Sequence, residues 1–122
     1  MKYIEYNPIM KHGGCILRTF MKLLDKDEEI IYNELLDLCK KMGHTDYTDI
    51  EVFEEYLKNN NYVKVNDNKD ILVKNLDNLE GKYACFCFKD NWYHMISIID
   101  NTVYDRKDDS LELKVISLYK YE

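Results

Sequence analysis

The hydrophobic pattern of the 122-residue chain changes its period near Asn59, and this change constrains the fold more than any other feature. Before Asn59, apolar residues recur every three or four positions, as they do on one face of a helix. After it, apolar and polar residues mostly alternate, as in strands that bury one face. Neither a linker nor a repeat separates the two halves. We therefore predict a single α+β domain over residues 1–122, with about three N-terminal helices packed on a C-terminal antiparallel β-sheet.

Three helices are expected in the first half of the chain, each from a start signal followed by an apolar stripe. The first begins at about Cys15, directly after two glycines that provide a sharp entry. The second is capped by Asp25 or Asp27 and ends at Gly43. The third begins at the sequence Thr48–Glu51, which has the form of a capping box.

Short strands are expected in the second half. Asp90-Asn91 and Asp100-Asn101 are pairs that favour tight hairpin turns, and an Asn/Asp/Lys-rich turn over residues 66–70 separates the first two candidates. The candidate strands are Tyr62–Val65, Ile71–Val73, Lys82–Lys89, Trp92–Ile99, Val103–Asp105 and Leu113–Tyr119.

The charge pattern excludes several classes of partner. The net charge is −6, and no segment is basic enough to follow a phosphate backbone, so we expect no nucleic-acid binding. The acidic excess falls on the second and third helices, where a solvated outer face is expected and a recognition surface is the alternative. We expect no membrane association and no cofactor, because no apolar run approaches the roughly 20 residues that span a bilayer and no cofactor motif occurs. Residues 1–10 lack a signal-peptide core, which predicts a cytoplasmic location, or the host cytoplasm for a viral protein.

Cys15 is the candidate nucleophile. At the start of a helix its sulfur lies near free backbone N–H groups and the positive end of the helix dipole, and both stabilise the thiolate. Gly13 and Gly14 leave room for a substrate backbone, and the N–H of Cys15 itself can bind an oxyanion. The alternative is a small packing residue in the first turn.

His94 is the best candidate base, because a strand holds it more rigidly than the loops that carry His12 and His44. If Asp100-Asn101 forms a two-residue turn, Asp105 lies diagonal to His94 on the same face of the sheet, where it can accept the second imidazole N–H. A turn at Asn101-Thr102 moves Asp105 one pair further away, and a three-residue loop puts it on the opposite face. Asn101 is the alternative orienting residue.

Other candidates line the same region. Arg18 lies one turn from Cys15 and can pair with a site carboxylate or with substrate, or serve only in structure. Trp92 shares a strand face with His94 and can shield the His–Asp hydrogen bond or simply pack in the core. Packing is the expected role of the remaining cysteines, Cys39, Cys85 and Cys87, and no metal site is expected because no second paired ligand motif accompanies them.

The chain resembles the papain-like cysteine peptidases and, more narrowly, a group of small phage and Firmicutes proteins of largely unassigned function. The segments that carry the resemblance are Asn7-Pro8, Gly14–Thr19, His94–Asp100 and Val103–Asp105. It implies a minimal papain-like fold in which Cys15 is the nucleophile, His94 the base and Asp105 the orienting residue. Papain-like enzymes place a glutamine upstream of the cysteine to complete the oxyanion hole. This chain contains no glutamine, so Asn7 or His12 is the expected substitute.

Two functions of different class follow from these residues. The first is a small cysteine hydrolase, a peptidase or isopeptidase that acts on a peptide or protein substrate through an acyl-enzyme. The second is a catalytically inactive binding module on the same fold, such as a phage-encoded inhibitor of a host factor that uses the acidic helices.

Overall fold

The computed structural model describes residues 1–66 and 71–122. It has the predicted α+β arrangement, with helices first and a mostly antiparallel sheet after them. The helices are α1 (Cys15–Leu24), α2 (Glu28–Lys41) and α3 (Ile50–Asn59), together with the short 3-10 turns η1 (Val73–Asn75) and η2 (Asp108–Glu112). The strands are β1 (Lys2–Glu5), β2 (Tyr62–Asn66), β3 (Lys82–Lys89), β4 (Trp92–Ile99), β5 (Thr102–Asp105) and β6 (Lys114–Tyr121).

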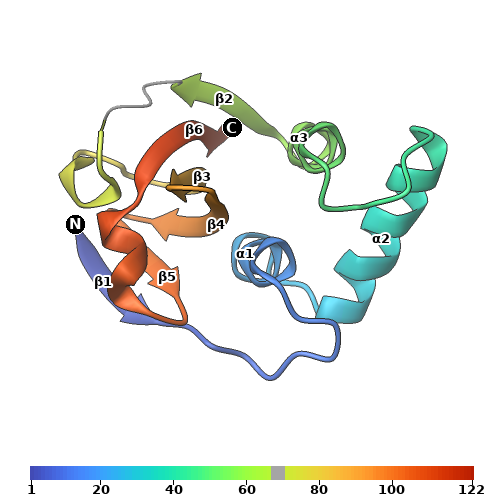
Figure 1. The fold of residues 1–122 in the computed structure, drawn as a ribbon, viewed down its shortest axis with the longest axis horizontal. Helices are drawn as coiled ribbons and strands as arrows, with labels where there is room; N and C mark the ends of the chain where they lie inside the picture. The colour runs from blue at the N-terminus through green and yellow to red at the C-terminus, as the bar shows by residue number, and fades with distance from the viewer. Residues whose placement is uncertain (67–70) are drawn as a thin grey trace.

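The sheet has the order β1-β5-β4-β3-β6-β2 across the described residues, and the helices lie on one side of it. Figure 1 shows α1 and α3 next to the sheet and α2 outside them. Strand β1 pairs with β5 in parallel, whereas the other pairs are antiparallel. Among the described helices, none has the length and apolar character needed to cross a membrane.

Buried side chains in the described residues form one cluster on each face of the sheet. The cluster under the helices includes Phe20, Phe53 and Met95. The cluster on the opposite face includes Ile98 and Val103 and is covered by the chain around η1 and η2. The strongly apolar strands of the second half are thus buried on both faces.

The N-terminal strand β1 is absent from our predictions. Residues 1–10 alternate between apolar and polar, which is the signal that could have identified it. Its hydrogen bonds come from β5, because Tyr3 lies opposite Val103 and the Tyr6 N–H donates to the Asp105 carbonyl at 2.7 Å. Alternating polarity over so few residues does not by itself predict a strand. The segment becomes a strand here because β5, from the other end of the chain, pairs with it.

The predicted capping box of the third helix is wrong. The helix begins at Ile50 with Asp49 as its N-cap, and no side chain caps it. Thr48 instead donates its N–H and its hydroxyl to Asp46 at 2.9 and 2.7 Å. The Asp49 carboxylate is also engaged elsewhere, since it lies 2.9 Å from Nδ1 of His44. Local side-chain bonds in the loop therefore replace the reciprocal cap.

The predicted strand Ile71–Val73 is also wrong. Leu72 forms one isolated bridge with Lys114, and the chain then enters η1. Val73 is fully buried, so the segment turns inward instead of continuing along the edge of β6. The turn predicted over residues 66–70 falls largely on residues 67–70, which lie outside the described residues.

Candidate active site

Cys15 is the first residue of α1 and follows Gly14, the N-cap, which has a φ of 96°. The N–H of Arg18 is the first to bond within the helix, at 3.1 Å from the Gly14 carbonyl. The amides of residues 15–17 therefore precede the first helical hydrogen bond, as expected at a helix N-terminus. This end of α1 combines a thiol with a positive dipole end, the arrangement expected from the sequence.

Helix α1 docks on the part of β4 that β5 leaves unpaired. The pairs between β4 and β5 run from Ile99 back to Ser97, so the backbone of Met95 faces α1. The Thr19 hydroxyl donates to the Met95 carbonyl at 3.0 Å, and the Met95 N–H hydrogen-bonds the Cys15 sulfur. Because β5 is short and ends at Asp105, the backbone of β4 at Met95 is free to bind α1 and its first residue, Cys15.

The two-residue turn that our prediction required is present. Asp100 and Asn101 both have positive φ values, 48° and 61°, and Ile99 pairs with Thr102. This register brings Asp105 to His94, with 2.7 Å between Asp105 Oδ2 and His94 Nε2. Both residues are buried, at 2% and 5% exposure.

The thiol of Cys15 and the imidazole of His94 are within hydrogen-bonding contact of each other. Because Asp105 occupies Nε2 of His94, Nδ1 is the nitrogen left to face Cys15. Burial acts to raise the pKa of the Cys15 thiol, but the hydrogen bond and the charge of His94 oppose it. With the Met95 N–H and the charge of Arg18 added, the pKa of Cys15 falls below its usual value.

His94 is shifted in the opposite direction. Burial acts to lower its pKa, but hydrogen bonds with Asp105 and Cys15 and the charges of both groups raise the pKa to about 9. The two shifts act together, because each favours the charged form of its own group, a thiolate for Cys15 and an imidazolium for His94. A thiolate is the nucleophilic form of cysteine, and an imidazolium holds the proton that a leaving group needs.

Asp105 is held from several sides. Its Oδ1 accepts a hydrogen bond from Arg18 Nε at 3.2 Å and one from the Arg106 N–H at 2.8 Å, which leaves Oδ2 for His94. Burial acts to raise the pKa of Asp105, but the hydrogen bond and the charge of His94, the Arg106 N–H and the charge of Arg18 lower it. Of the roles considered for Arg18, the geometry favours pairing with the site carboxylate.

Trp92 covers the imidazole. Its ring lies 4.8 Å from the His94 ring between centroids, with 16° between the planes. Trp92 is 46% exposed, so the alternative of a core tryptophan is wrong, and the residue stacks on the buried His94 while remaining in contact with solvent. This is the shielding position considered from the sequence.

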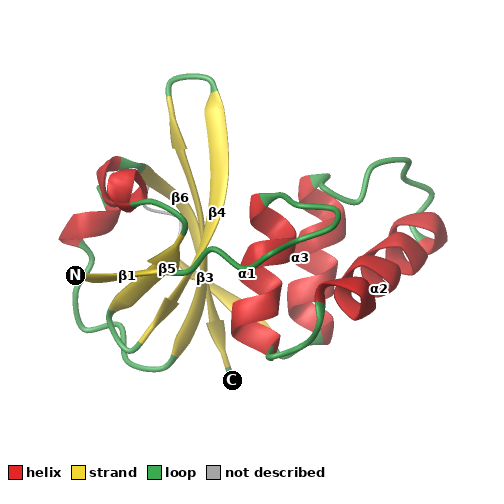
Figure 2. Cartoon of the chain, turned by 90° about the horizontal axis from the view of Figure 1, so that it is seen from below, coloured by secondary structure: helices red, strands yellow, loops and turns green. Residues whose placement is uncertain are grey.

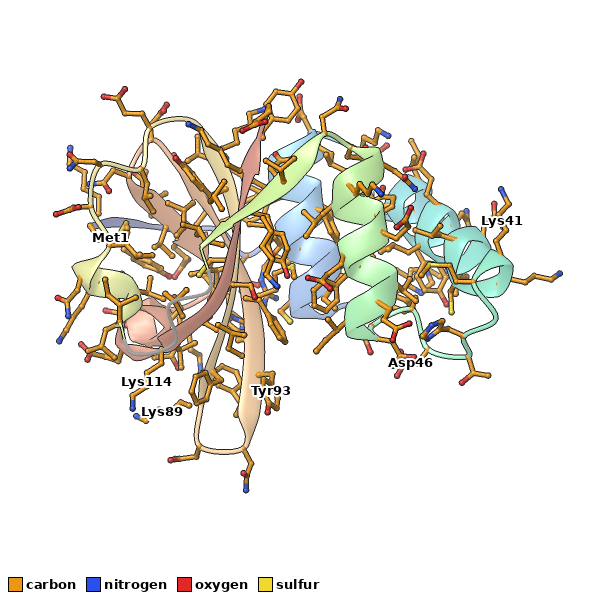
Figure 3. The ribbon with its side chains drawn as sticks, turned by 90° about the horizontal axis from the view of Figure 1, so that it is seen from above. Met1, Lys41, Asp46, Lys89, Tyr93 and Lys114 are labelled. Atoms are coloured by element: carbon orange, nitrogen blue, oxygen red, sulfur yellow. The ribbon has the colours of Figure 1, made fainter. Side chains whose placement is uncertain are left out.

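A cleft of about 930 Å³ opens at Cys15 and His94. The sheet wall is mainly apolar and includes Phe88 and Tyr93 of the β3–β4 hairpin. This hairpin projects beyond the rest of the sheet in Figure 2. Figure 3 shows Tyr93 on the side of the hairpin that faces the helices and Asp46 across from it, in the loop between α2 and α3. The opposite wall is formed by that loop and the start of α3, including Tyr47 and Glu51.

The proposed oxyanion side chains lie apart from this cleft. The residues that line it include Gly14 but neither Asn7 nor His12. Asn7 is exposed. The His12 ring instead stacks on Tyr32 at 3.6 Å between centroids, and its Nε2 lies 3.0 Å from Glu29.

Two site residues were missed by the sequence reasoning. His44 lies in the cleft wall between Asp49 and Glu51, at 2.9 and 3.2 Å, and hydrogen bonding to Asp49 is the main reason that its pKa is raised. Its position in a polar loop suggested a solvated side chain and gave no signal for these partners. Glu28 was interpreted only as a favourable charge at a helix start. Its carboxylate is buried and binds the backbone that leads into Cys15.

Cys39, Cys85 and Cys87 are buried free thiols, in agreement with a packing role. Burial is the main cause that raises the pKa of Cys39, and the pKa of Cys87 is raised chiefly by its contact with Cys85. Cys15 thus differs from Cys39 and Cys87 in the direction of its shift. Among the described residues, no group of three His, Cys, Asp or Glu side chains could hold a metal ion.

Comparisons with protein-family models, curated proteins and solved structures gave no match. The resemblance to papain-like peptidases therefore stays a prediction.

Proposed function

We propose that the chain is a papain-like cysteine hydrolase, a peptidase or isopeptidase, with Cys15 as nucleophile, His94 as acid and base, and Asp105 as the residue that orients His94. The observation that carries the proposal is the buried 2.7 Å contact between Asp105 and His94, which leaves the second ring nitrogen for the thiol. Helix α1 contributes the thiol, and the consecutive strands β4 and β5 contribute the imidazole and the carboxylate. These are the three groups that a nucleophile, base and orienting residue require.

The reaction follows from the protonation state of the site. The Cys15 thiolate attacks the carbonyl carbon of the substrate, a C–S bond forms, and the carbonyl electrons move to oxygen. The His94 imidazolium gives its proton to the leaving amine as the C–N bond breaks, which leaves a thioester on Cys15. Neutral His94 then removes a proton from water, which attacks the thioester. The acid product leaves, and the thiolate–imidazolium pair is restored.

The cleft supports a peptide as the substrate class. Its sheet wall presents several aromatic side chains, among them Phe88 and Tyr93 of the hairpin, on which the side chains of a peptide can pack. Apolar side chains of an extended peptide would pack on this wall, whereas polar groups would meet the loop that carries Asp49 and Glu51. The backbone N–H of Cys15 is the donor available for the oxyanion.

The test measures alkylation of each thiol by iodoacetamide as a function of pH, with the labelled cysteine located by mass spectrometry. The proposal predicts that Cys15 reacts quickly at pH 6, where an ordinary thiol is protonated, and that His94→Ala abolishes this reactivity. His44→Ala is the matched control, because it removes another histidine from the cleft wall without touching the pair.

A wild-type Cys15 that reacts at pH 6 no faster than free cysteine contradicts the proposal and leaves the binding module as the function. Equal loss of reactivity in the His94 and His44 variants also contradicts it. A further measurement incubates the protein with a peptide aldehyde, which should form a hemithioacetal at Cys15 only.

A further inference from the structure

Glu28 binds the chain just before the nucleophile. It is the first residue of α2, and only 9% of it is exposed. Its Oε1 accepts the N–H of Lys11 at 2.7 Å, and its Oε2 accepts those of His12 and Gly13 at 2.8 and 3.0 Å. One buried carboxylate therefore fixes three consecutive peptide groups. Charge-assisted bonds of this kind are stronger than bonds between neutral groups.

The side chain of His12 is tied to the same helix. Its ring stacks on Tyr32 with 11° between the planes, and its Nε2 lies 3.0 Å from Glu29. The segment 11–13 is thus held through its backbone by the first residue of α2 and through a side chain by the first two turns. Glu28 supplies the backbone contacts, which are the ones that fix peptide orientation.

The two glycines that join this segment to Cys15 do not fix their own backbone conformation. Gly13 and Gly14 have φ values of 76° and 96°, and a Cβ built on either would meet nothing within 4 Å. Glycine is therefore required at both positions by the positive φ, and not by crowding from neighbouring atoms. Because glycine adopts positive and negative φ with similar ease, this pair does not fix its own geometry. The hydrogen bonds from the Lys11, His12 and Gly13 amides to Glu28 restrict the backbone conformation of the glycine pair.

The direction of the Cys15 N–H depends on this geometry. The peptide plane between Gly14 and Cys15 is set by the ψ of Gly14, and Gly14 lines the cleft. We propose that Glu28 is a positioning residue that aims the Cys15 amide at the carbonyl attacked by the Cys15 thiolate. The inference rests on the proposed function and deepens it, because it says how an oxyanion donor is held when neither Asn7 nor His12 lines the cleft.

The experiment compares two reactions of Cys15. Acylation by p-nitrophenyl acetate forms a tetrahedral oxyanion before p-nitrophenolate leaves. Alkylation by iodoacetamide forms the C–S bond as iodide leaves and creates no oxyanion. An oxyanion donor that is present but misdirected therefore slows the first reaction alone. Removal of one such donor typically costs about 10²–10³ in rate, so we expect Glu28→Gln to slow acylation by roughly 10- to 100-fold.

The iodoacetamide profile of Glu28→Gln should match the wild type between pH 5 and 9, since Glu28 is absent from the contacts that set the pKa of Cys15. Asp37→Asn makes the same charge change at an exposed position of α2 and should leave both reactions unaltered. Glu28→Asp keeps the charge but shortens the reach, and it should give a smaller loss of acylation. It also serves as the test if Glu28→Gln does not fold.

Unchanged acylation in the folded Glu28 variants overturns the inference. A parallel loss of acylation and alkylation overturns it as well, because Glu28 would then support only the fold or the thiolate. Neither result affects the proposed function if wild-type Cys15 reacts at pH 6. A wild-type Cys15 without that reactivity refutes the proposed function and the inference together.

Discussion

Replacing Asp105 with asparagine tests the thiolate–imidazolium pair most directly. The substitution keeps the size of the side chain and removes the charge that His94 and Arg18 share. A hydrogen bond between charged partners contributes about 1.5–3 kcal/mol, against about 0.5–1.5 kcal/mol for a neutral one. The difference, about 1–1.5 kcal/mol, is stabilisation that the imidazolium loses.

The loss should appear as slower alkylation of Cys15 in acid. Since about 1.4 kcal/mol corresponds to a factor of ten, about 1–1.5 kcal/mol lowers the ratio of thiolate to thiol by about 5- to 12-fold, and the alkylation rate falls by that factor at any pH where the thiol form dominates. The assay is the iodoacetamide rate at Cys15 from pH 4 to 10. Asp108→Asn, an exposed carboxylate on η2, provides the control for net charge.

Stability must be followed in the same variant. Arg18 is 7% exposed and loses its carboxylate partner, and an unpaired buried charge costs on the order of 3 kcal/mol. The double variant Arg18→Met/Asp105→Asn removes that charge and should recover part of the lost free energy of unfolding in urea. If folded Asp105→Asn alkylates at pH 6 as fast as the wild type, the carboxylate does not sustain the ion pair, and the reasoning is refuted.

Two other predictions concern pH and the cleft. In a Cys15→Ala background, the hydrogen bond and the charge of Asp105 still act to raise the pKa of His94 against the effect of burial, and we expect the net shift to remain upward. The pair then stabilises the fold fully below His94's ordinary pKa of 6.5, and this contribution, about 1 kcal/mol, is lost as pH rises through the raised value. The urea midpoint should therefore fall from pH 6 to pH 10, and a Cys15→Ala/Asp105→Asn variant that shows the same fall counts against the linkage. Phe88→Ala shortens the aromatic wall and should raise KM for peptide substrates by roughly tenfold while the iodoacetamide rate at Cys15 stays constant. A loss of kcat alone would show that Phe88 does not bind substrate.

The sequence by itself determined that three helices precede the sheet, where the long hairpin strands lie, and the register at Asp100-Asn101. These features depend on local signals, namely the hydrophobic period, glycines before Cys15, and two residues that accept positive φ. Because side chains in a strand alternate with a period of two, one correct turn was enough to place Asp105 on the face of His94.

Only the tertiary structure decided what surrounds that pair. The contact between α1 and Met95 depends on where β5 ends. The hydrogen bonds from residues 11–13 to Glu28 join a loop to the start of a helix 15 or more residues away. Arg18 likewise reaches a carboxylate 87 positions along the chain. No period or cap in the sequence encodes such contacts, because they form between segments whose relative position is set by packing of the whole core. The role proposed for Cys15 is therefore suggested by its neighbours in sequence, whereas the groups proposed to shift its pKa and to orient its amide are its neighbours in space.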